Sequence, residues 1–290
     1  MKIKKYLANF KDLKNKTVLI TGASGGIGSE IAKHFAFVGC NLIFANRSAS
    51  KAEQLKNEIL RLYPNTKIDV IELDLCSNKS VKQFLAQVKN FKIDYFVHNA
   101  GVYNIKRYTT QLGFDNIYQT NCLMPYFITK TLLPYFKENH SKVIFMGSIA
   151  YNYSKINPQD IEFKLCKKIN KVYGNSKRIA MFAFTELFKD NNIEFSIAHP
   201  GLTLTKMTNH YPKGINWLVK IGLKIVCPPP SKAGLSVVYA TKAKTIGNQW
   251  VGPNIFNIWG KPKVKTFKCN QQEAQYAFQI VEKQISNIDI

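Results

Sequence analysis

A buried-strand pattern near the start of the chain runs directly into a glycine-rich turn, and a helical pattern follows at once. Residues 17–20 are mostly β-branched and apolar, the turn reads TGASGGIG at 21–28, and apolar residues then recur at helical spacing up to Val38. A strand, a tight glycine turn and a helix in this order are typical of the first unit of a parallel α/β sheet. This start predicts a sheet whose strands are joined by helices.

The same alternation of short apolar runs and helical patterns continues along most of the chain. Pro125 and Pro134 lie within one long helical pattern and are expected to bend it or to mark helix starts. We expect an α/β fold, a doubly wound parallel sheet of the Rossmann type with helices on both faces. The predicted strands are 17–20, 41–45, 67–73, 93–97, 142–146 and 193–198, and the predicted helices are 27–38, 49–63, 79–91, 112–136, 172–189 and 232–240.

The sequence has no internal repeat and no linker rich in Gly, Ser or Pro, so we expect a single domain over 17–290. Residues 1–16 are lysine-rich without an apolar core, which argues against a secretory signal and indicates a basic N-terminal extension. No apolar run reaches the ~18 residues that span a bilayer.

The six cysteines form no Cys-x-x-Cys pair. This favours free thiols in a reducing, cytoplasmic compartment, and no metal site is predicted.

The formal net charge of +23 raises the question of nucleic-acid binding. Only four of the 41 basic residues are arginine, the better reader of phosphate and guanine, and the lysines are spread without a dense block. We therefore interpret the charge as a lysine-biased solvated surface and expect no nucleic-acid partner. Weak attraction to anionic lipid surfaces or acidic partners is the alternative.

The glycines at 22, 26 and 28 suit a dinucleotide-binding turn, because glycine lets the backbone approach a pyrophosphate and the next helix offers free N–H groups. A site that prefers NAD usually has an acidic residue about 20 positions further on, which binds the ribose 2′-OH. Residues 41–48 contain no Asp or Glu and end in Asn46-Arg47-Ser48. Arg47 can pair with a ribose 2′-phosphate, so we predict NADP(H) in preference to NAD(H). A surface arginine without that role is the alternative.

Polar groups follow the carboxyl ends of the predicted strands, where open parallel sheets bind ligands. Asp74 can accept a hydrogen bond from an adenine amino group there, and a helix N-cap role fits its spacing equally well. Ser148 can hydrogen-bond a substrate carbonyl. Tyr173 and Lys177 lie at i and i+4 on one helical face, so the ammonium is expected to lower the pKa of the tyrosine from about 10 toward neutrality.

This ordered series resembles the short-chain dehydrogenase/reductase family over residues 15–205. The resemblance implies that Tyr173 is the acid-base, that Ser148 orients the carbonyl and that Lys177 tunes the tyrosine and binds the nicotinamide ribose. It also implies that Asn121 supports a proton-relay water. The cofactor-binding residues that it implies are Gly22, Ser24, Gly26, Ile27, Gly28, Asn46, Arg47, Asp74, Leu75, Asn99, Ala100, Gly101, Tyr173, Lys177, Pro200, Gly201, Thr203 and Thr205.

Two departures from the common family pattern refine the resemblance. Asn is usual where His98 stands; we interpret His98, like His199, as a packed histidine, and a catalytic base at His98 is the alternative. Ser148 and Tyr173 are 25 positions apart, longer than the common spacing. That segment and residues 45–47 resemble retinol-dehydrogenase-like and WW-domain-oxidoreductase-like members. The likeness implies hydrophobic alcohols, aldehydes or ketones as substrates.

The family builds its substrate lid after Thr205, and we place it at approximately 206–230. Residues 215–226 have apolar residues at helical spacing with lysines between them, as in an amphipathic helix. A lid over an apolar pocket, core packing and peripheral membrane contact are open alternatives for this stretch. The formation of a homo-oligomer is also left open.

The sequence as a whole predicts an NADP(H)-dependent oxidoreductase that interconverts a carbonyl and an alcohol on a hydrophobic small molecule by hydride transfer. Tyr103, Ile149 and Tyr151 are expected to help shape its pocket. A catalytically silent dinucleotide-binding regulator or scaffold of the same fold is the alternative, although such a binder does not need both a serine and a tyrosine at the site. An epimerase or dehydratase of nucleotide sugars is disfavoured, because only 85 residues follow Thr205.

Overall fold

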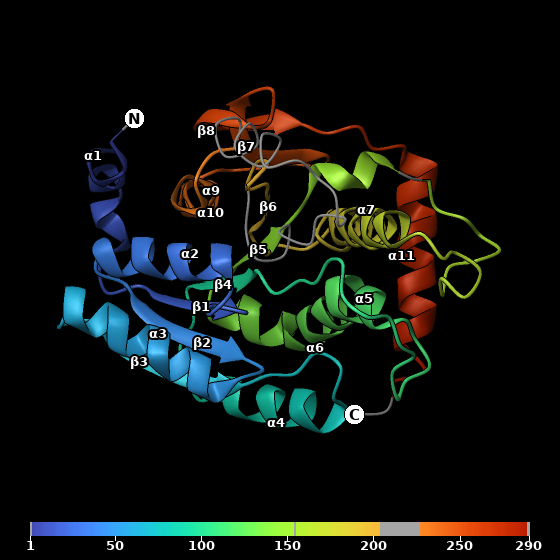
Figure 1. Cartoon of the computed structure of the whole chain (residues 1–290), viewed down its shortest axis with the longest axis horizontal. Helices are drawn as coiled ribbons and strands as arrows, with labels where there is room; N and C mark the ends of the chain where they lie inside the picture. The colour runs from blue at the N-terminus through green and yellow to red at the C-terminus, as the bar shows by residue number, and fades with distance from the viewer. Residues whose placement is uncertain (1, 154, 204–226, 289–290) are drawn as a thin grey trace, which may run out of the picture.

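One eight-stranded sheet organises the computed structural model, which describes residues 2–153, 155–203 and 227–288 (Figure 1). The strand order is β3-β2-β1-β4-β5-β6-β7-β8; neighbours are parallel from β3 to β7, and β8 runs antiparallel to β7. This order confirms the predicted doubly wound sheet. The strands are β1 Thr17–Thr21, β2 Asn41–Asn46, β3 Ile68–Glu72, β4 Tyr95–His98, β5 Lys142–Met146, β6 Phe195–Ala198, β7 Gln249–Ile255 and β8 Trp259–Thr266.

Helices cover both faces of the sheet, and successive residues of β1 point to opposite sides. Val18 and Ile20 pack with α2 (Gly26–Phe37), α3 (Ala49–Leu62) and α10 (Leu235–Ala240). Leu19 packs on the other face with α4, α6 and α7. These three helices span Asn78–Val88, Met124–Glu138 and Ile169–Leu187, respectively. Two further helices complete the layers: α9 (Pro230–Ala233) lies beside α2, and α11 (Gln271–Ile285) lies against α7.

The basic N-terminal residues pack against the sheet-and-helix core. They form α1 (Ile3–Leu7) and a 3₁₀ segment, Ala8–Leu13. Leu7, Phe10 and Leu13 are buried in the same cluster as α2. The lysines of α1 face outward, so this extension combines an apolar inner side with a charged outer side.

The structure adds elements that the sequence analysis missed. The sheet edge, β7 and β8, carries Pro253 and Pro262 opposite each other. Prolines are tolerated at a sheet edge, but in a sequence they weaken a strand pattern. α11 was missed although Ala274, Ala277 and Val281 recur at helical spacing and are buried. The long helix that was predicted from residue 112 begins four residues later, at Asn116, in α5 (Asn116–Tyr118). A short π-helix, Gln119–Leu123, then joins α5 to α6.

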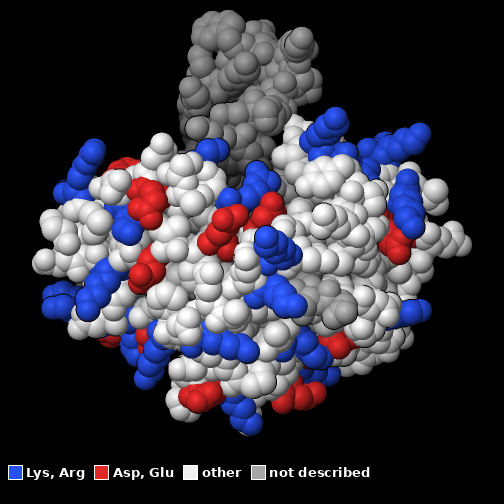
Figure 2. Space-filling model, turned by 90° about the horizontal axis from the view of Figure 1, so that it is seen from below, with Lys and Arg blue, Asp and Glu red and all other residues white. Residues whose placement is uncertain are grey.

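The charged side chains are mixed on the face seen in Figure 2, where Lys and Arg are scattered and Asp and Glu lie among them. This distribution supports the interpretation of the lysines as a solvated surface. All six cysteines are free thiols, and Cys40, Cys122 and Cys227 are buried. None of the described helices is long and apolar enough to cross a membrane.

An ion pair ties the last helix to α7. Arg178 Nε and Nη2 each lie 2.5 Å from a carboxylate oxygen of Glu273, and both side chains are largely buried. Burial alone would raise the pKa of Glu273, but hydrogen bonds from Arg178 and from the Ile156 amide outweigh it and hold the pKa below its usual 4.5. The carboxylate therefore stabilises the fold while it is ionised.

Glu273→Gln is expected to lower the free energy of unfolding by about 2 kcal/mol at pH 7, because one buried guanidinium loses its charged partner. The folded pKa is depressed, so this contribution is present above the unfolded pKa of 4.5 and is lost as the pH falls through the folded value. Denaturant unfolding at several pH values checks this: the difference between the two proteins should shrink below pH 4.5. Glu53→Gln, at an exposed pair with Lys56, should change stability by less than ~0.5 kcal/mol.

Candidate active site

The glycine turn between β1 and α2 is shaped for close backbone contacts. Gly22 has a φ of +65°, and its N–H donates to the Ala45 carbonyl at 2.8 Å. A Cβ on Gly28 would lie 2.4 Å from the Gly22 oxygen and 2.7 Å from Asn99 Nδ2, so a side chain there does not fit. Gly25, the N-cap of α2, has no side chain to cover the first N–H groups of the helix. These groups are therefore available to an anionic ligand.

Asn46, at the end of β2, supports the glycine turn through two hydrogen bonds. Its Oδ1 accepts a hydrogen bond from the Ala23 amide at 3.1 Å, and its Nδ2 donates to Ser24 Oγ at 2.6 Å. The side chain is buried, so it holds the turn in place and does not point outward. The next residue, Arg47, is exposed at the carboxyl edge of the sheet. Their assignment to cofactor binding stays a prediction.

Asp74 lies at the same edge, just after β3. Its Oδ1 accepts a hydrogen bond from the Cys76 amide at 2.9 Å. The N-cap of α4 is Ser77, whose hydroxyl accepts from the Ser80 amide, so the alternative of Asp74 as the helix cap is wrong. Leu75 is buried.

Sequence reasoning missed Tyr108, an exposed residue that contributes to this edge. The nearby Cys76 thiol, together with burial and the charge of Asp74, raises the pKa of Tyr108, while the charge of Arg47 lowers it. Tyr108 thus lies within electrostatic reach of both predicted nucleotide-binding residues. No local motif marks it, because a loop distant in sequence brings it to β3.

The Asn99-Ala100-Gly101 stretch joins the end of β4 to the glycine turn. Asn99 Nδ2 donates to the carbonyls of Thr21 and Gly22 at 3.0 and 3.1 Å. The amides of Asn99 and Ala100 both donate to Thr21 Oγ1. These bonds fix the ends of two neighbouring parallel strands, β1 and β4.

Asn121 lies in the short π-helix and is fully buried. Its Oδ1 accepts from the Val102 amide at 2.8 Å, while its Nδ2 donates to the Val102 carbonyl at 2.9 Å and to Ser176 Oγ at 3.2 Å. The side chain thereby connects the loop after Gly101 to the helix that carries Tyr173. Single π-helical turns are frequent at functional sites.

Lys177 is one turn after Tyr173 on α7 and is buried. Its Nζ donates to the Met146 carbonyl at 2.9 Å and lies 4.9 Å from the centre of the Phe145 ring. Burial lowers the pKa of Lys177 to about 8. The ammonium is also close to Gly101, since a Cβ there would lie 3.5 Å from Nζ.

The Ser148 side chain lies close enough to Tyr173 to affect its pKa, so the structure brings the predicted acid-base and the predicted carbonyl orienter together. Ser148 Oγ accepts a hydrogen bond from the Ala150 amide at 3.2 Å. Burial raises the pKa of Tyr173, the nearby Ser148 hydroxyl lowers it, and the net direction is upward. The prediction that Lys177 lowers this pKa is therefore wrong for this structure, because burial of the phenol dominates.

The two histidines at strand ends are packed in the core. His98 contacts the rings of Phe96 and Phe184, and its Nε2 bonds Thr129 Oγ1 at 2.7 Å. Burial lowers the pKa of His98 to about 3, so it stays neutral, and the catalytic-base alternative is not supported. His199 stacks on Trp250 with ring centres 4.7 Å apart.

Two of the three expected pocket residues lie near Tyr173. The Tyr103 ring is 4.9 Å from the Tyr173 ring, and Ile149 directly follows Ser148. Tyr151 is instead a core residue: it is 2% exposed, packs against Trp250 and Phe267, and its hydroxyl accepts from the Lys268 amide. The prediction that Tyr151 shapes the pocket is wrong, because the turn after Ser148 directs this side chain inward.

The stretch after β6 begins with Pro200 and Gly201, where Gly201 has a φ of +83°. Thr203 is buried, and its hydroxyl has no hydrogen-bond partner among residues 2–153, 155–203 and 227–288. Thr205 and the amphipathic stretch 215–226 lie outside the described residues. Of the expected lid, only 227–230 are described, and they lead into α9.

The site therefore combines a backbone cradle for an anionic group with a serine–tyrosine pair and a buried lysine, all along one edge of the sheet. The glycine turn and Asn99 are joined to each other, and Asn121 connects Val102 to the Tyr173 helix. This arrangement can bind a phosphate-bearing ligand and exchange a proton with a substrate oxygen.

Comparison with known proteins agrees with this geometry. A family model described as short chain dehydrogenase matches residues 16–216. The chain is similar to short-chain dehydrogenase TIC 32 A of Brassica napus, at 30% identity, covering 70% of this chain and 69% of that protein. It is also similar to human retinol dehydrogenase 13, at 29% identity and 68% and 62% coverage. An uncharacterised protein of Mycobacterium paratuberculosis shares the fold, with a TM-score of 0.72, 23% identity and coverage of 96% and 97%.

Proposed function

Because the chain belongs to the short-chain dehydrogenase family, we propose that it interconverts a carbonyl and an alcohol on a hydrophobic small molecule with NADP(H). The observation that carries the proposal is that Ser148 and Tyr173 lie close together on the same sheet edge as the glycine turn. A protein that only binds a dinucleotide needs the turn but has no use for that pair. The silent regulator is therefore the weaker candidate.

The turn fits a dinucleotide, since an added Cβ at Gly28 would fill the space beside the Gly22 carbonyl. When bound, the nicotinamide supplies or accepts the hydride. In the reducing direction, Ser148 donates a hydrogen bond to the substrate oxygen and Tyr173 transfers its hydroxyl proton to that oxygen. In the oxidising direction, Tyr173 takes the proton from the alcohol.

Lys177 and Asn121 complete the site. With a pKa of about 8, Lys177 is mostly protonated at neutral pH, and we assign it the other role that the family resemblance implies, that of holding the nicotinamide ribose. Asn121 uses both donors of its amide on Val102 and Ser176. It thereby keeps the Gly101 strand end at a fixed distance from the Tyr173 helix.

A hydrophobic substrate is supported by two observations. Two aromatic side chains lie near the acid-base: Tyr103 contacts Tyr173, and Tyr153 lies close enough to raise the pKa of Tyr173. In addition, a similar protein is named for retinol, an apolar alcohol.

The proposal is tested by following NADPH and NADH absorbance with a panel of aldehydes, ketones, sterols and retinoids, and with the matching alcohols. We expect turnover of apolar carbonyl compounds, with higher kcat/KM for NADPH. Tight NADPH binding without turnover of any compound would instead support the silent regulator.

The choice of NADP(H) is tested at Arg47. Arg47→Asp is expected to weaken NADPH binding by roughly 10- to 100-fold, because a charge-assisted bond to the 2′-phosphate is replaced by repulsion. NADH, which lacks this phosphate, should change less than about threefold. Fluorescence titration of both nucleotides measures this, with Arg61→Asp, an equal charge change at an exposed site on α3, as the control. Equal weakening of both nucleotides would refute the assignment.

A further inference from the structure

The turn between β7 and β8 exposes two large apolar side chains at the edge of the sheet (Figure 1). We call residues 254–259 the hairpin tip. Ile255 is 49% exposed, and Phe256 is 87% exposed, more than any other large apolar side chain of the described residues. Scattered apolar residues are normal at a protein surface, so exposure alone does not indicate a function.

The backbone of the hairpin tip makes this phenylalanine unusual. The Ile258 amide donates to the Ile255 carbonyl at 3.0 Å, and the two residues between them, Phe256 and Asn257, have φ values of +49° and +57°. A turn with two left-handed central residues favours Asn, Asp or Gly, and a bulky side chain is strained in this conformation. Asn257 fits this preference and Phe256 does not. Neither the turn nor core packing therefore explains a phenylalanine at this position.

Lysines surround the hairpin tip. Lys265 Nζ donates to Asn257 Oδ1 at 2.6 Å, and Lys232 Nζ lies 5.7 Å from the centre of the Trp259 ring. Lys261 follows Trp259 by two residues and is exposed. The exposed apolar side chains thus have positive charge on more than one side.

The sequence around the hairpin contains no acidic residue that could offset this charge. Residues 195–272 include eleven lysines and no Asp or Glu, although the whole chain has 18 acidic residues. On the face shown in Figure 2, by contrast, acidic and basic side chains are mixed. Lysines together with exposed apolar side chains suit an anionic lipid bilayer, where the lysines meet the headgroups and the apolar groups enter the interface. An acidic partner without an apolar surface would match the lysines and leave Phe256 in water.

The hairpin tip lies on the sheet edge that carries the candidate active site. β7 is parallel to β6, so its carboxyl end points the same way as the carboxyl ends of the other parallel strands. The Asn257 carbonyl and His199 Nε2 are hydrogen-bonded at 3.1 Å, and a Cβ on Gly201 would lie 3.1 Å from the Ile258 oxygen. The tip is therefore fixed to the turn after β6. A surface bound at the tip would face the edge that holds the serine–tyrosine pair.

We propose that the hairpin tip docks the protein on anionic lipid bilayers. Ile255 and Phe256 enter the interface. Lys232 and Lys261 contact the lipid phosphates, and the two kinds of contact act together because either alone binds a bilayer weakly. The inference goes beyond the proposed carbonyl chemistry. Vesicle binding is measured without any substrate, so either proposal can fail while the other stands.

Flotation of the full chain with vesicles tests the docking. We expect binding to vesicles of phosphatidylcholine mixed with phosphatidylserine and at least about tenfold weaker binding to phosphatidylcholine alone. Raising the salt from about 0.1 to about 1 M shortens the Debye length from about 10 to about 3 Å and should release the protein. Lys232→Gln combined with Lys261→Gln should weaken binding by about tenfold or more, since each lysine near the surface contributes about fivefold.

Phe256→Asn separates docking from folding. Binding to the mixed vesicles should fall at least about tenfold, because one large apolar side chain no longer enters the interface. The Tm should stay the same or rise, since asparagine suits a left-handed turn position better than phenylalanine. A loss of binding that merely followed unfolding would instead come with a lower Tm.

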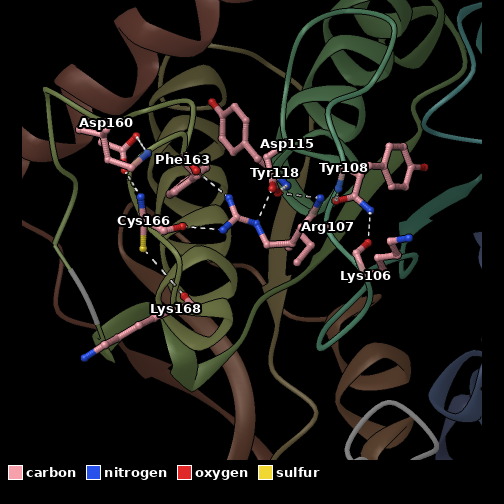
Figure 3. Close-up of polar contacts among 12 residues, drawn as sticks. Lys106, Arg107, Tyr108, Asp115, Tyr118, Asp160, Phe163, Cys166 and Lys168 are labelled. Carbon is pink, nitrogen blue, oxygen red and sulfur yellow. Dashed lines mark hydrogen bonds and ion pairs between the residues drawn. The ribbon is translucent and has the colours of Figure 1, made fainter.

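The controls make the same kinds of change elsewhere. Leu165 is 73% exposed and belongs to a loop that Arg107 holds through the carbonyls of Phe163 and Cys166 (Figure 3). Leu165→Asn therefore removes an exposed apolar side chain from a supported loop, and vesicle binding should stay within about twofold.

Lys89→Gln combined with Lys92→Gln is the matched charge control. These two exposed lysines lie between α4 and β4, at the opposite edge of the sheet, and the double variant should also stay within about twofold. Equal binding of Phe256→Asn and the unmodified protein would overturn the proposal, as would equal binding to both kinds of vesicle. The proposal is also rejected if the protein ignores vesicles and forms a dimer that Phe256→Asn abolishes, because a second copy then covers the tip.

Discussion

Replacing Tyr173 by Phe is expected to reduce turnover at least ~10²-fold, the scale of lost acid–base catalysis. The variant keeps the ring whose centre lies 4.9 Å from that of Tyr103 and loses only the hydroxyl, which lies near Ser148. NADPH affinity should stay within about threefold, because the nucleotide cradle lies on a different strand end. Single-turnover absorbance measurements, together with fluorescence titration of NADPH, separate these two effects.

Tyr103→Phe is the matched control for this experiment. It also removes one phenolic hydroxyl at the site, here one that donates to Asn170 Oδ1 at 2.5 Å. Since that hydroxyl is already committed to a protein acceptor, kcat should fall by less than about fivefold. Near-normal turnover in Tyr173→Phe would contradict the proton-transfer role. Equal losses of turnover in both variants would point to a general disturbance of the side chains around Tyr173.

A single methyl group at Gly28 is expected to disable the nucleotide site. In Gly28→Ala, the new Cβ would stand 2.4 Å from the Gly22 oxygen, 2.7 Å from Asn99 Nδ2 and 2.9 Å from the Ala23 oxygen, so backbone must move. We expect the free energy of unfolding to fall by about 1–3 kcal/mol, the range for overpacking. NADPH affinity should fall more than tenfold, because the displaced atoms belong to the cradle.

The next residue supplies the control. Ser29→Ala removes one hydroxyl, which bonds the Gly26 carbonyl at 3.2 Å, and adds no volume in the same first turn of α2. It should change stability by less than ~1 kcal/mol and leave NADPH affinity within about twofold. Thermal unfolding and nucleotide titration test both variants. A Gly28→Ala protein with unchanged affinity would show that the turn does not need its tight contacts for binding.

The parts of the fold and site that were predictable have local signatures. Gly22, Ser148 and Tyr173 were placed at one sheet edge because each follows a strand or starts a helix with clear periodicity. Tyr108 was missed because its neighbours at the site, Cys76 and Asp74, lie far from it in the sequence. The pKa of Tyr173 was wrong in direction because sequence spacing reveals a neighbouring charge but not the depth of burial.

The position of α11 has a consequence for how the molecule is made. Glu282 receives Lys130 and the Tyr126 hydroxyl from α6, and Glu273 receives Arg178 from α7. Both α6 and α7 are thus held by a helix that the ribosome produces after them. During synthesis the residues of the glycine turn emerge long before α11, so the part of the sheet around β1 can fold first, whereas α6 and α7 gain these contacts only once α11 has been made.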